Sequence, residues 1–317
     1  MMQPISDIAD SSAGTYAPHS KTIAVAGATG DLGRRIVSYL LEQGATVKAL
    51  VRKSTHPDSI SHLKSMDVIV SEVDFNNKEE LVTAVSGADC IVSALNGLEP
   101  VIMGVQTEVL EAAIAAGVPR FIPSDYCIDY TKLPAGSNRN LDLRRQFHDR
   151  INQSGIAATS IFNGMFADLL TGQAPVVLFG LKRVVYWGNA SQALDFTTIE
   201  NTAAFTARAA LDDATPRYLR IAGDVLDVHG LAKAASAATG NNFRPMRVGG
   251  LGGLQTMIRI TRTLLPKKDE VFPPWQGMQY LHNMFTGLPK LKPLDNDRYP
   301  GIHWTTVEEI LATRKDT

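Results

Sequence analysis

The sequence predicts an α/β protein built on a doubly wound parallel sheet, and three observations lead to this class. Short apolar runs alternate with helical patterns through the first half of the 317-residue chain, as in sheets with helices on both faces. A glycine-spaced turn closes the first apolar run. The composition, with 44% hydrophobic and 20% charged residues, is typical of a globular protein with a sizeable core.

The first predicted unit is a strand, a glycine turn and a helix within residues 21–35 and the positions that follow. An apolar run at 23–26 ends in Gly27, Gly30 and Gly33, and a helical pattern begins near Ile36. In this context the spacing G-x-x-G-x-x-G indicates dinucleotide binding, because the glycines permit a tight turn and a close approach of backbone N–H groups to the pyrophosphate. The helix N-terminus adds a partial positive charge. The sequence therefore predicts a Rossmann-type sheet, with a simple glycine turn as the alternative.

Two basic residues follow the second predicted strand, residues 46–51. They are Arg52 and Lys53, at the end of the strand that faces the adenosine ribose in such folds. An acidic residue there would bind the 2′-hydroxyl of NAD, whereas a guanidinium suits the 2′-phosphate of NADP. We therefore predict NADP(H) as the cofactor. A solvated surface arginine is the alternative interpretation of Arg52.

The predicted strands and helices that follow continue the alternation. Further strands are expected at 67–73, 89–95, 120–123, 157–162, 176–179, 184–187 and 218–221, and helices at 78–85, 101–116, 143–153, 198–210, 228–239, 254–264 and 276–285. Ligands bind beyond the carboxyl ends of parallel strands, which places Asp74, residues 93–96 and residues 124–126 at the predicted site. We expect a flexible tail at 1–20, an NADP-binding domain at 21–165, and a smaller α/β substrate-binding region at 166–317. The prediction leaves open whether strands of this last region join the main sheet.

The composition excludes several classes of function. A formal net charge of −1 gives no reason to expect nucleic acid or a membrane surface as a partner. The two cysteines, Cys90 and Cys127, have no metal-ligand spacing and fit a reducing compartment. The first 20 residues lack the pattern of a secretory signal, and no apolar run reaches the length of a membrane helix. We expect a cytoplasmic protein without a metal.

At several segments the chain resembles a known family. These are VAGATGDLGRRIV at 25–37, ALVR at 49–52, RFIPSDY at 120–126, SGIAATSIFNGMF at 154–166 and YPGIHWTTVEEIL at 299–311. They are similar to the isoflavone-reductase group of atypical short-chain dehydrogenases/reductases, within the NmrA-like family. The resemblance implies a Rossmann domain, NADPH, and reduction of phenolic molecules such as isoflavones, lignans and phenylcoumarans. A fungal branch of the family binds the dinucleotide and acts as a regulator.

The resemblance also implies roles for individual residues. Arg52 and Lys53 would contact the 2′-phosphate. Ser124 and Asp125 would lie near the nicotinamide. Phe162 and Asn163 would cover the far side of the nicotinamide ring. The complete set of expected cofactor residues is Gly27, Thr29, Gly30, Asp31, Leu32, Gly33, Arg52, Lys53, Asp74, Ser93, Ala94, Leu95, Ser124, Asp125, Phe162 and Asn163.

The chain differs from the family at one position that matters for the mechanism, the lysine of a conserved helix pattern. Reductases of this group carry the pattern K-x-x-x-R-R-x-I-x-x-x-G before the sixth strand, and counting back from Gly155 places Arg144 at the lysine. Lysine can release a proton when buried, but arginine effectively cannot. Arg144 would therefore stabilise a developing oxyanion as a fixed cation rather than act as the acid.

The proton must then come from another group, and the sequence leaves several open. The chain contains no Y-x-x-x-K pattern. Tyr126 and Tyr130 follow the fifth strand, and His148 lies one helical turn after Arg144 on the same face. Each has a structural alternative: Tyr126 as a packing residue, Tyr130 and the neighbouring Lys132 as loop surface, and His148 as a surface residue. Water is a further donor.

Aromatic and sulfur-containing side chains suggest where a substrate would lie. Met165, Phe166 and Trp187 are expected to line an aromatic pocket, with packing in the core as the alternative. We predict an NADPH-dependent reductase of a phenolic, aromatic or enone-type small molecule. A non-catalytic NADP(H) sensor and a quinone reductase of the same family are the alternatives, and a homodimer is left open.

Overall fold

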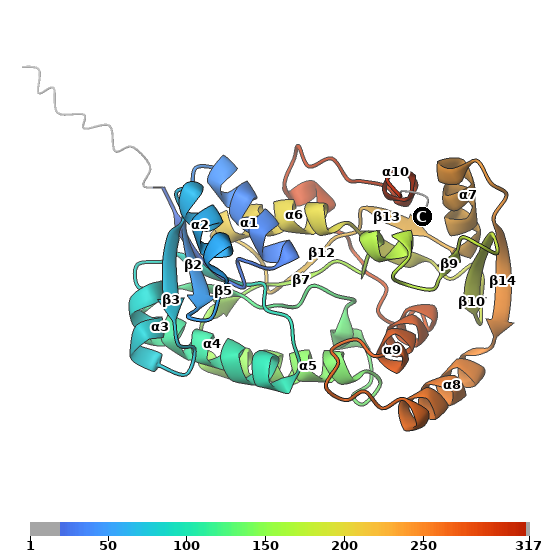
Figure 1. The fold of residues 1–317 in the computed structure, drawn as a ribbon, viewed down its shortest axis with the longest axis horizontal. Coiled ribbons are helices and arrows are strands. Elements are labelled where there is room, and N and C mark those ends of the chain that lie inside the picture. The colour runs from blue at the N-terminus through green and yellow to red at the C-terminus, as the bar shows by residue number, and fades with distance from the viewer. Residues whose placement is uncertain (1–19, 315–317) are drawn as a thin grey trace, which may run out of the picture.

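The computed structural model of this chain describes residues 20–314, so the predicted tail at 1–20 lies almost wholly outside the described residues. Its centre is a six-stranded parallel sheet in the order β3-β2-β1-β4-β5-β6 (Figure 1). The strands are β1 (Thr22–Ala26), β2 (Thr46–Arg52), β3 (Ile69–Val73), β4 (Cys90–Ser93), β5 (Arg120–Ile122) and β6 (Ala157–Ala158). The order reverses between β1 and β4, which creates a switch point for ligand binding. The predicted fold class is confirmed.

Helices cover both faces of this sheet, because its strands are apolar on both sides. On one face Ile23 and Val25 of β1 pack with α1 (Asp31–Glu42), α2 (Pro57–Ser65) and α6 (Ile199–Leu211). On the other, Ala24 and Ala26 pack with α3 (Lys78–Val85), α4 (Gln106–Ala115) and α5 (Arg139–Ser154). A π-helical turn, η1 (Pro100–Val105), leads into α4. Figure 1 shows the two helical layers above and below the sheet.

The helix α2 was not predicted from the sequence. Its residues have only a weak apolar periodicity, and just Ile60 and Leu63 are buried. The helix begins because the His56 side chain accepts a hydrogen bond from Asp58 N and because Pro57 occupies the first turn, where its missing N–H has no cost.

The predicted strand at 157–162 is divided in two. Ala157 and Ala158 pair with β5, whereas β7 (Ser160–Phe162) pairs with β12 (Tyr218–Arg220). The change of partner occurs at Thr159, whose N–H donates to Phe121 O while Ser160 N donates to Arg217 O. Both β12 and α6, which follow residue 166 in the chain, therefore belong with the first half of the molecule, since β12 pairs with β7 and α6 packs on α1.

The remaining segments form a second lobe with its own core. Its strands are β8 (Met165–Phe166), β9 (Val177–Leu178), β10 (Arg183–Trp187), β11 (Leu194–Thr197), β13 (Asp224–Leu226) and β14 (Arg244–Gly249), in the orders β14-β10-β9 and β13-β11-β8. Its helices are α7 (Val228–Thr239), α8 (Leu251–Leu264), α9 (Pro274–Phe285) and α10 (Val307–Ala312). Short 3-10 turns are η2 (Tyr130–Lys132), η3 (Ala167–Thr171) and η4 (Asn296–Arg298). This lobe lies to the right in Figure 1.

Two kinds of feature are absent from residues 20–314. Between these limits no helix is both long and apolar enough to cross a membrane. In the same part of the chain no group of three or more His, Cys, Asp or Glu side chains is placed to hold a metal ion.

Candidate functional site

The glycine turn has the geometry that a dinucleotide requires. Gly27 has a φ of +86°, and a Cβ there would lie 2.8 Å from Ala94 O. A Cβ at Gly33 would lie 2.1 Å from Gly27 O, so only glycine lets α1 approach the turn this closely. Gly30 N donates to Gly27 O at 3.0 Å and begins α1 without a side-chain cap. The turn thus fits the phosphates of a dinucleotide at the N-terminus of α1.

The outer side of this turn is open. Thr29, Gly30 and Asp31 are exposed and Leu32 is half-buried. Asp31 pairs with Arg34 at 2.6 Å and Arg35 at 3.2 Å. Although partial burial opposes them, these arginines lower the pKa of Asp31.

The two basic residues after β2 differ in their surroundings. Arg52 is exposed, and its side chain forms no hydrogen bond or ion pair with the rest of the described chain. Lys53 Nζ pairs with Glu80 Oε1 at 2.8 Å, and Glu80 Oε2 accepts from Asp74 N at 2.8 Å. Arg52 is therefore the more available cation at the predicted 2′-phosphate position, whereas Lys53 and Asp74 are tied to Glu80.

A buried glutamine, which sequence reasoning missed, joins the ends of β4 and β5. Gln106 Oε1 accepts from Ser93 Oγ at 2.6 Å and from Ser124 N at 3.0 Å, and Ser124 Oγ donates to Leu95 O. Ala94 N donates to Ala26 O at 2.8 Å beside the glycine turn. These contacts set the spacing between the strand ends where the cofactor is expected. Nothing in the local pattern around Gln106 signals this role, because its partners lie on two other elements.

Arg144 lies directly beside the end of β5. Its Nε donates to Ser124 O at 3.0 Å and its Nη1 to Asn140 O at 3.1 Å, and the residue is only 7% exposed. Burial opposes its charge, but interactions with Tyr280, Cys127 and Asp125 outweigh burial, so its pKa lies above the usual value. Arg144 is thus a fixed cation at the carboxyl end of β5, a position called the strand edge below.

The three other candidates for proton transfer lie in different environments. Tyr126 packs in the core between the sheet and α6, and burial raises its pKa, although the Thr206 side chain of α6 opposes the rise. This placement favours the packing alternative for Tyr126.

Tyr130 and His148, in contrast, are not surface residues and lie together. Tyr130 is fully buried, and its ring meets those of Phe162 and His148 edge-on, at centroid distances of 5.3 and 6.3 Å. His148, with a 12% exposed side chain, stacks on Tyr218 and has its Nε2 2.5 Å from the Tyr218 hydroxyl. Burial, assisted by Arg217, lowers the pKa of His148. Lys132 is partly exposed and pairs with Asp129 at 3.3 Å.

Asp125 forms the centre of a buried polar cluster. Its Oδ2 accepts from the Tyr130 hydroxyl at 2.9 Å and from Ser160 Oγ at 2.8 Å. Burial raises the pKa of Asp125, although Ser160, Arg144 and Tyr130 oppose the rise. The Tyr130 hydroxyl thus donates its hydrogen bond to Asp125 and does not point towards a substrate.

Some buried polar atoms near the strand ends have no hydrogen-bond partner within the described chain. They include Gln106 Nε2, Asp125 Oδ1 and Asn163 Oδ1. Asn163 is otherwise held by its Nδ2, which donates to Thr202 Oγ1 at 3.2 Å, and by its N–H, which donates to Cys127 O at 3.0 Å. Because buried polar groups are rarely left unpaired, these atoms fit a ligand with donors and acceptors, such as the carboxamide of a nicotinamide.

The three expected substrate residues lie in two different environments. Met165 and Phe166 in β8 are half-buried, directly after Asn163 and Gly164. Trp187 is buried in the second core and packs near Phe285, with ring centroids 6.3 Å apart. This favours the core alternative for Trp187.

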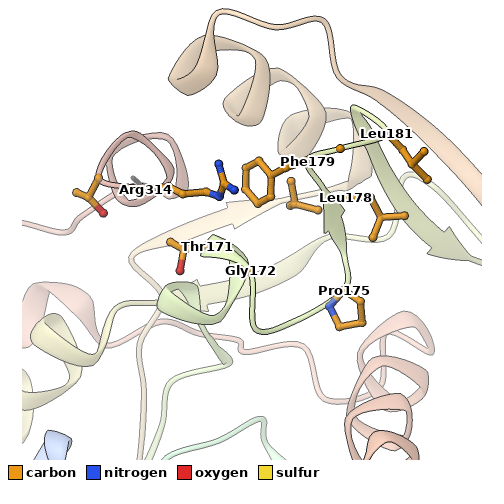
Figure 2. A pocket seen from close by; sticks show the side chains of 10 residues that line it. Thr171, Gly172, Pro175, Leu178, Phe179, Leu181 and Arg314 are labelled. Carbon is orange, nitrogen blue, oxygen red and sulfur yellow. The ribbon is translucent and has the colours of Figure 1, made fainter. Parts of the chain in front are cut away.

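A cavity in the second lobe lies away from these residues. It has a volume of about 760 Å³ and is formed by Thr171, Gly172, Pro175, Val177, Leu178, Phe179, Gly180, Leu181, Thr313 and Arg314. Figure 2 shows the Arg314 guanidinium facing the Phe179 ring, 4.0 Å from its centroid. None of the predicted cofactor or catalytic residues lines this cavity.

The parallel sheet, the glycine turn and the unpaired atoms at the strand edge define a dinucleotide-binding α/β protein. The chain belongs to the NmrA-like family, whose model matches residues 19–310. The resemblance expected from the sequence is confirmed.

Two proteins of similar sequence are named as reductases or their homologs. Pinoresinol reductase 2 of Arabidopsis thaliana is 29% identical over 208 residues, which cover 61% of this chain and 65% of the relative. An isoflavone reductase homolog of Nicotiana tabacum is 28% identical over 307 residues, covering 91% and 96%.

Solved structures show the same fold. AtPrR2 with NADP+ and (+)-pinoresinol aligns with a TM-score of 0.76 at 22% identity, covering 92% of this chain and 98% of the other. An NADPH-dependent quinone oxidoreductase of Escherichia coli, complexed with NADPH, aligns with a TM-score of 0.68 at 20% identity and the same coverage. The expected NADP(H) cofactor and reductase class agree with these proteins.

Proposed function

We propose that this protein is an NADP(H)-dependent oxidoreductase that reduces a phenolic, aromatic or enone-type small molecule. The observation that carries the proposal is the placement of a buried, permanently charged Arg144 against Ser124 O, at the strand edge that the glycine turn also faces. Names of the relatives support the reductase class and phenolic substrates such as pinoresinol.

The chain's own residues have separable tasks in this function. Gly27, Gly30 and Gly33 admit the pyrophosphate, and Arg52 binds the 2′-phosphate. Asn163 and Asp125 orient the nicotinamide through their unpaired oxygens. When bound, the cofactor supplies the hydride. Arg144 stabilises negative charge that develops on the substrate, since a cation in a site of low dielectric acts strongly on nearby charge.

Two alternatives rest on particular observations. The replacement of the family lysine by Arg144 favours a non-catalytic NADP(H) sensor, because arginine does not supply a proton. Similarity to the quinone oxidoreductase of E. coli favours a quinone as the substrate.

Oxidation of NADPH in the presence of pinoresinol, an isoflavone and 1,4-benzoquinone tests all three functions. A reductase of phenolic molecules oxidises NADPH with pinoresinol or the isoflavone, whereas a quinone reductase does so only with benzoquinone. A sensor binds both NADP+ and NADPH by calorimetry and oxidises NADPH with none of them. That last result would overturn the proposal.

A further inference from the structure

A face of α9 in the second lobe meets the beginning of α5. Gln276 Nε2 donates to Asn138 Oδ1 at 2.6 Å, Asn138 Nδ2 donates to Asn283 Oδ1 at 3.3 Å, and Arg139 N donates to Gln279 Oε1 at 3.3 Å. Positions 276, 280 and 283 share one side of a helix, because residues three and four apart are neighbours. Tyr280 therefore belongs to the face that α9 presents to α5.

Tyr280 interacts with the two residues that flank the strand edge. Its phenol interacts electrostatically with the Arg144 guanidinium and with Cys127. Arg144 is bonded to Ser124 O, and Cys127 O accepts from Asn163 N at 3.0 Å and from Gly164 N at 3.3 Å. Tyr280 thus approaches the candidate active site from the second lobe.

Within residues 20–314 the hydroxyl of Tyr280 has no hydrogen-bond partner, in contrast to the hydroxyl of Tyr130, which donates to Asp125. Burial raises the pKa of Tyr280 while the nearby Arg144 opposes that rise, so the phenol carries its proton at neutral pH. The ring is held near Phe272, with centroids 6.4 Å apart.

We propose that Tyr280 donates the proton to the substrate oxygen, with Arg144 stabilising the phenolate that remains. The inference rests on the proposed function and names the proton donor that the missing lysine leaves open. With an enone, the substrate gains a hydride at its β-carbon from the reduced nicotinamide, which is thereby oxidised. The π electrons move to the carbonyl oxygen, and this oxygen takes the proton as the Tyr280 O–H bond breaks. Water then returns a proton to Tyr280.

The variant Tyr280→Phe keeps the ring and removes only the hydroxyl. With NADPH and an isoflavone as the enone, we expect kcat to fall about 100-fold or more, while the Kd for NADPH stays within about twofold. A solvent deuterium isotope effect on the wild-type kcat should reflect the same proton. Tyr186→Phe is the matched control, because it removes the same hydroxyl from a tyrosine of β10 that lies outside the candidate site; it should keep kcat within about threefold. An unchanged kcat in Tyr280→Phe would overturn the proposal.

A binding measurement tests the same donor without turnover. The anion of 4-nitrophenol, added with NADP+, mimics the negatively charged oxygen, and its absorbance reports ionisation. We expect Tyr280→Phe to weaken its binding about tenfold or more, as for the loss of one hydrogen bond to a charged group. Equal affinity in both proteins, or no binding to the wild type, contradicts the role of Tyr280. Failure of the wild type to oxidise NADPH with any acceptor instead contradicts the proposed function, so the two failures are distinguishable.

Discussion

Arg52 and Lys53 are adjacent basic residues with different capacities to bind a phosphate. The guanidinium of Arg52 is free of partners in the described part of the chain, whereas Lys53 must leave Glu80 before it can bind an anion. A guanidinium also matches two phosphate oxygens at once. The choice between NADP(H) and NAD(H) therefore depends mainly on Arg52.

Replacing Arg52 tests this assignment. We expect Arg52→Ala to weaken NADPH binding roughly ten- to a hundredfold, the effect of losing one charge-assisted contact, and to leave NADH binding almost unchanged. Lys53→Ala is the control and should weaken NADPH less, because Lys53 is already paired. Calorimetry measures the affinities of the unmutated protein and of both variants for NADPH and NADH. Equal affinity of the unmutated protein for NADPH and NADH would refute the assignment.

Arg144 is the residue whose charge we expect to matter most for turnover. Arg144→Ala should lower kcat on the order of a hundred- to a thousandfold, as for the loss of one electrostatic donor. Arg144→Lys keeps a positive charge and should retain more activity than the alanine variant. The Kd for NADPH should barely change in either, since Arg144 contacts Ser124 and Asn140 rather than the glycine turn. Intact turnover in Arg144→Ala would reduce this residue to a structural role.

At the scale of elements, the junction of α5 and α9 connects the two lobes. Asn138 accepts from Asn140 N and Leu141 N as the N-cap of α5, and its side chain also contacts Gln276 and Asn283 of α9. Both partners are buried, so their polar groups depend on Asn138. The Asn138 side chain thus caps the start of α5 and also contacts α9, the helix that carries Tyr280.

The unfolding free energy should reveal this double role. We expect Asn138→Ala to cost about 2–4 kcal/mol, from the lost cap and from buried partners left unpaired. Asn77→Ala is the control, because Asn77 caps α3 in an exposed setting, and it should cost only about 1 kcal/mol. Urea unfolding of both variants measures the difference. Equal costs would show that the contacts with α9 add no stability.

In the whole molecule, elements from the second half of the chain pack into the first half. Helix α6 packs on α1 and β12 pairs with β7, and both contacts cross the predicted boundary at residue 165. Asp125 lies where these parts meet, bonded to Tyr130 and Ser160. Its ionisation therefore bears on the stability of the whole protein.

The sign of this effect follows from the raised pKa of Asp125. A carboxyl that holds its proton more tightly in the folded state makes stability fall as the pH rises from the unfolded pKa, about 3.9, towards the folded value. Asp125→Asn removes this titration. We expect its stability relative to the wild type to increase from pH 4 to pH 8, as measured by urea unfolding.

A second aspartate provides a control of opposite sign. Although partial burial opposes them, Tyr299 and Arg298 lower the pKa of Asp212. Its contribution to stability is therefore present above the unfolded pKa and lost as the pH falls through the folded pKa. Asp212→Asn should be less stable than the wild type at pH 7, with a difference that shrinks in acid. The same trend in both variants would contradict the assignment for Asp125.

The sheet, the glycine turn and the class of cofactor site could be predicted from the amino-acid sequence. These depend on local rules: apolar runs make buried strands, and Gly27 and Gly33 stand where any Cβ would meet backbone atoms. The same rules failed for α2, whose periodicity is weak, and for the strand at 157–162, which changes partner at Thr159.

Which side chains meet at the carboxyl ends of the strands depends on how distant segments pack, and the sequence did not predict it. The burial of Tyr130, the bridge made by Gln106 and the approach of Tyr280 to Arg144 each join residues from separate elements. A linear pattern records the period of a helix but not the partner of its face, because that partner is set by the packing of distant segments. The proton donor, unlike the glycine turn, therefore had to be read from the folded chain.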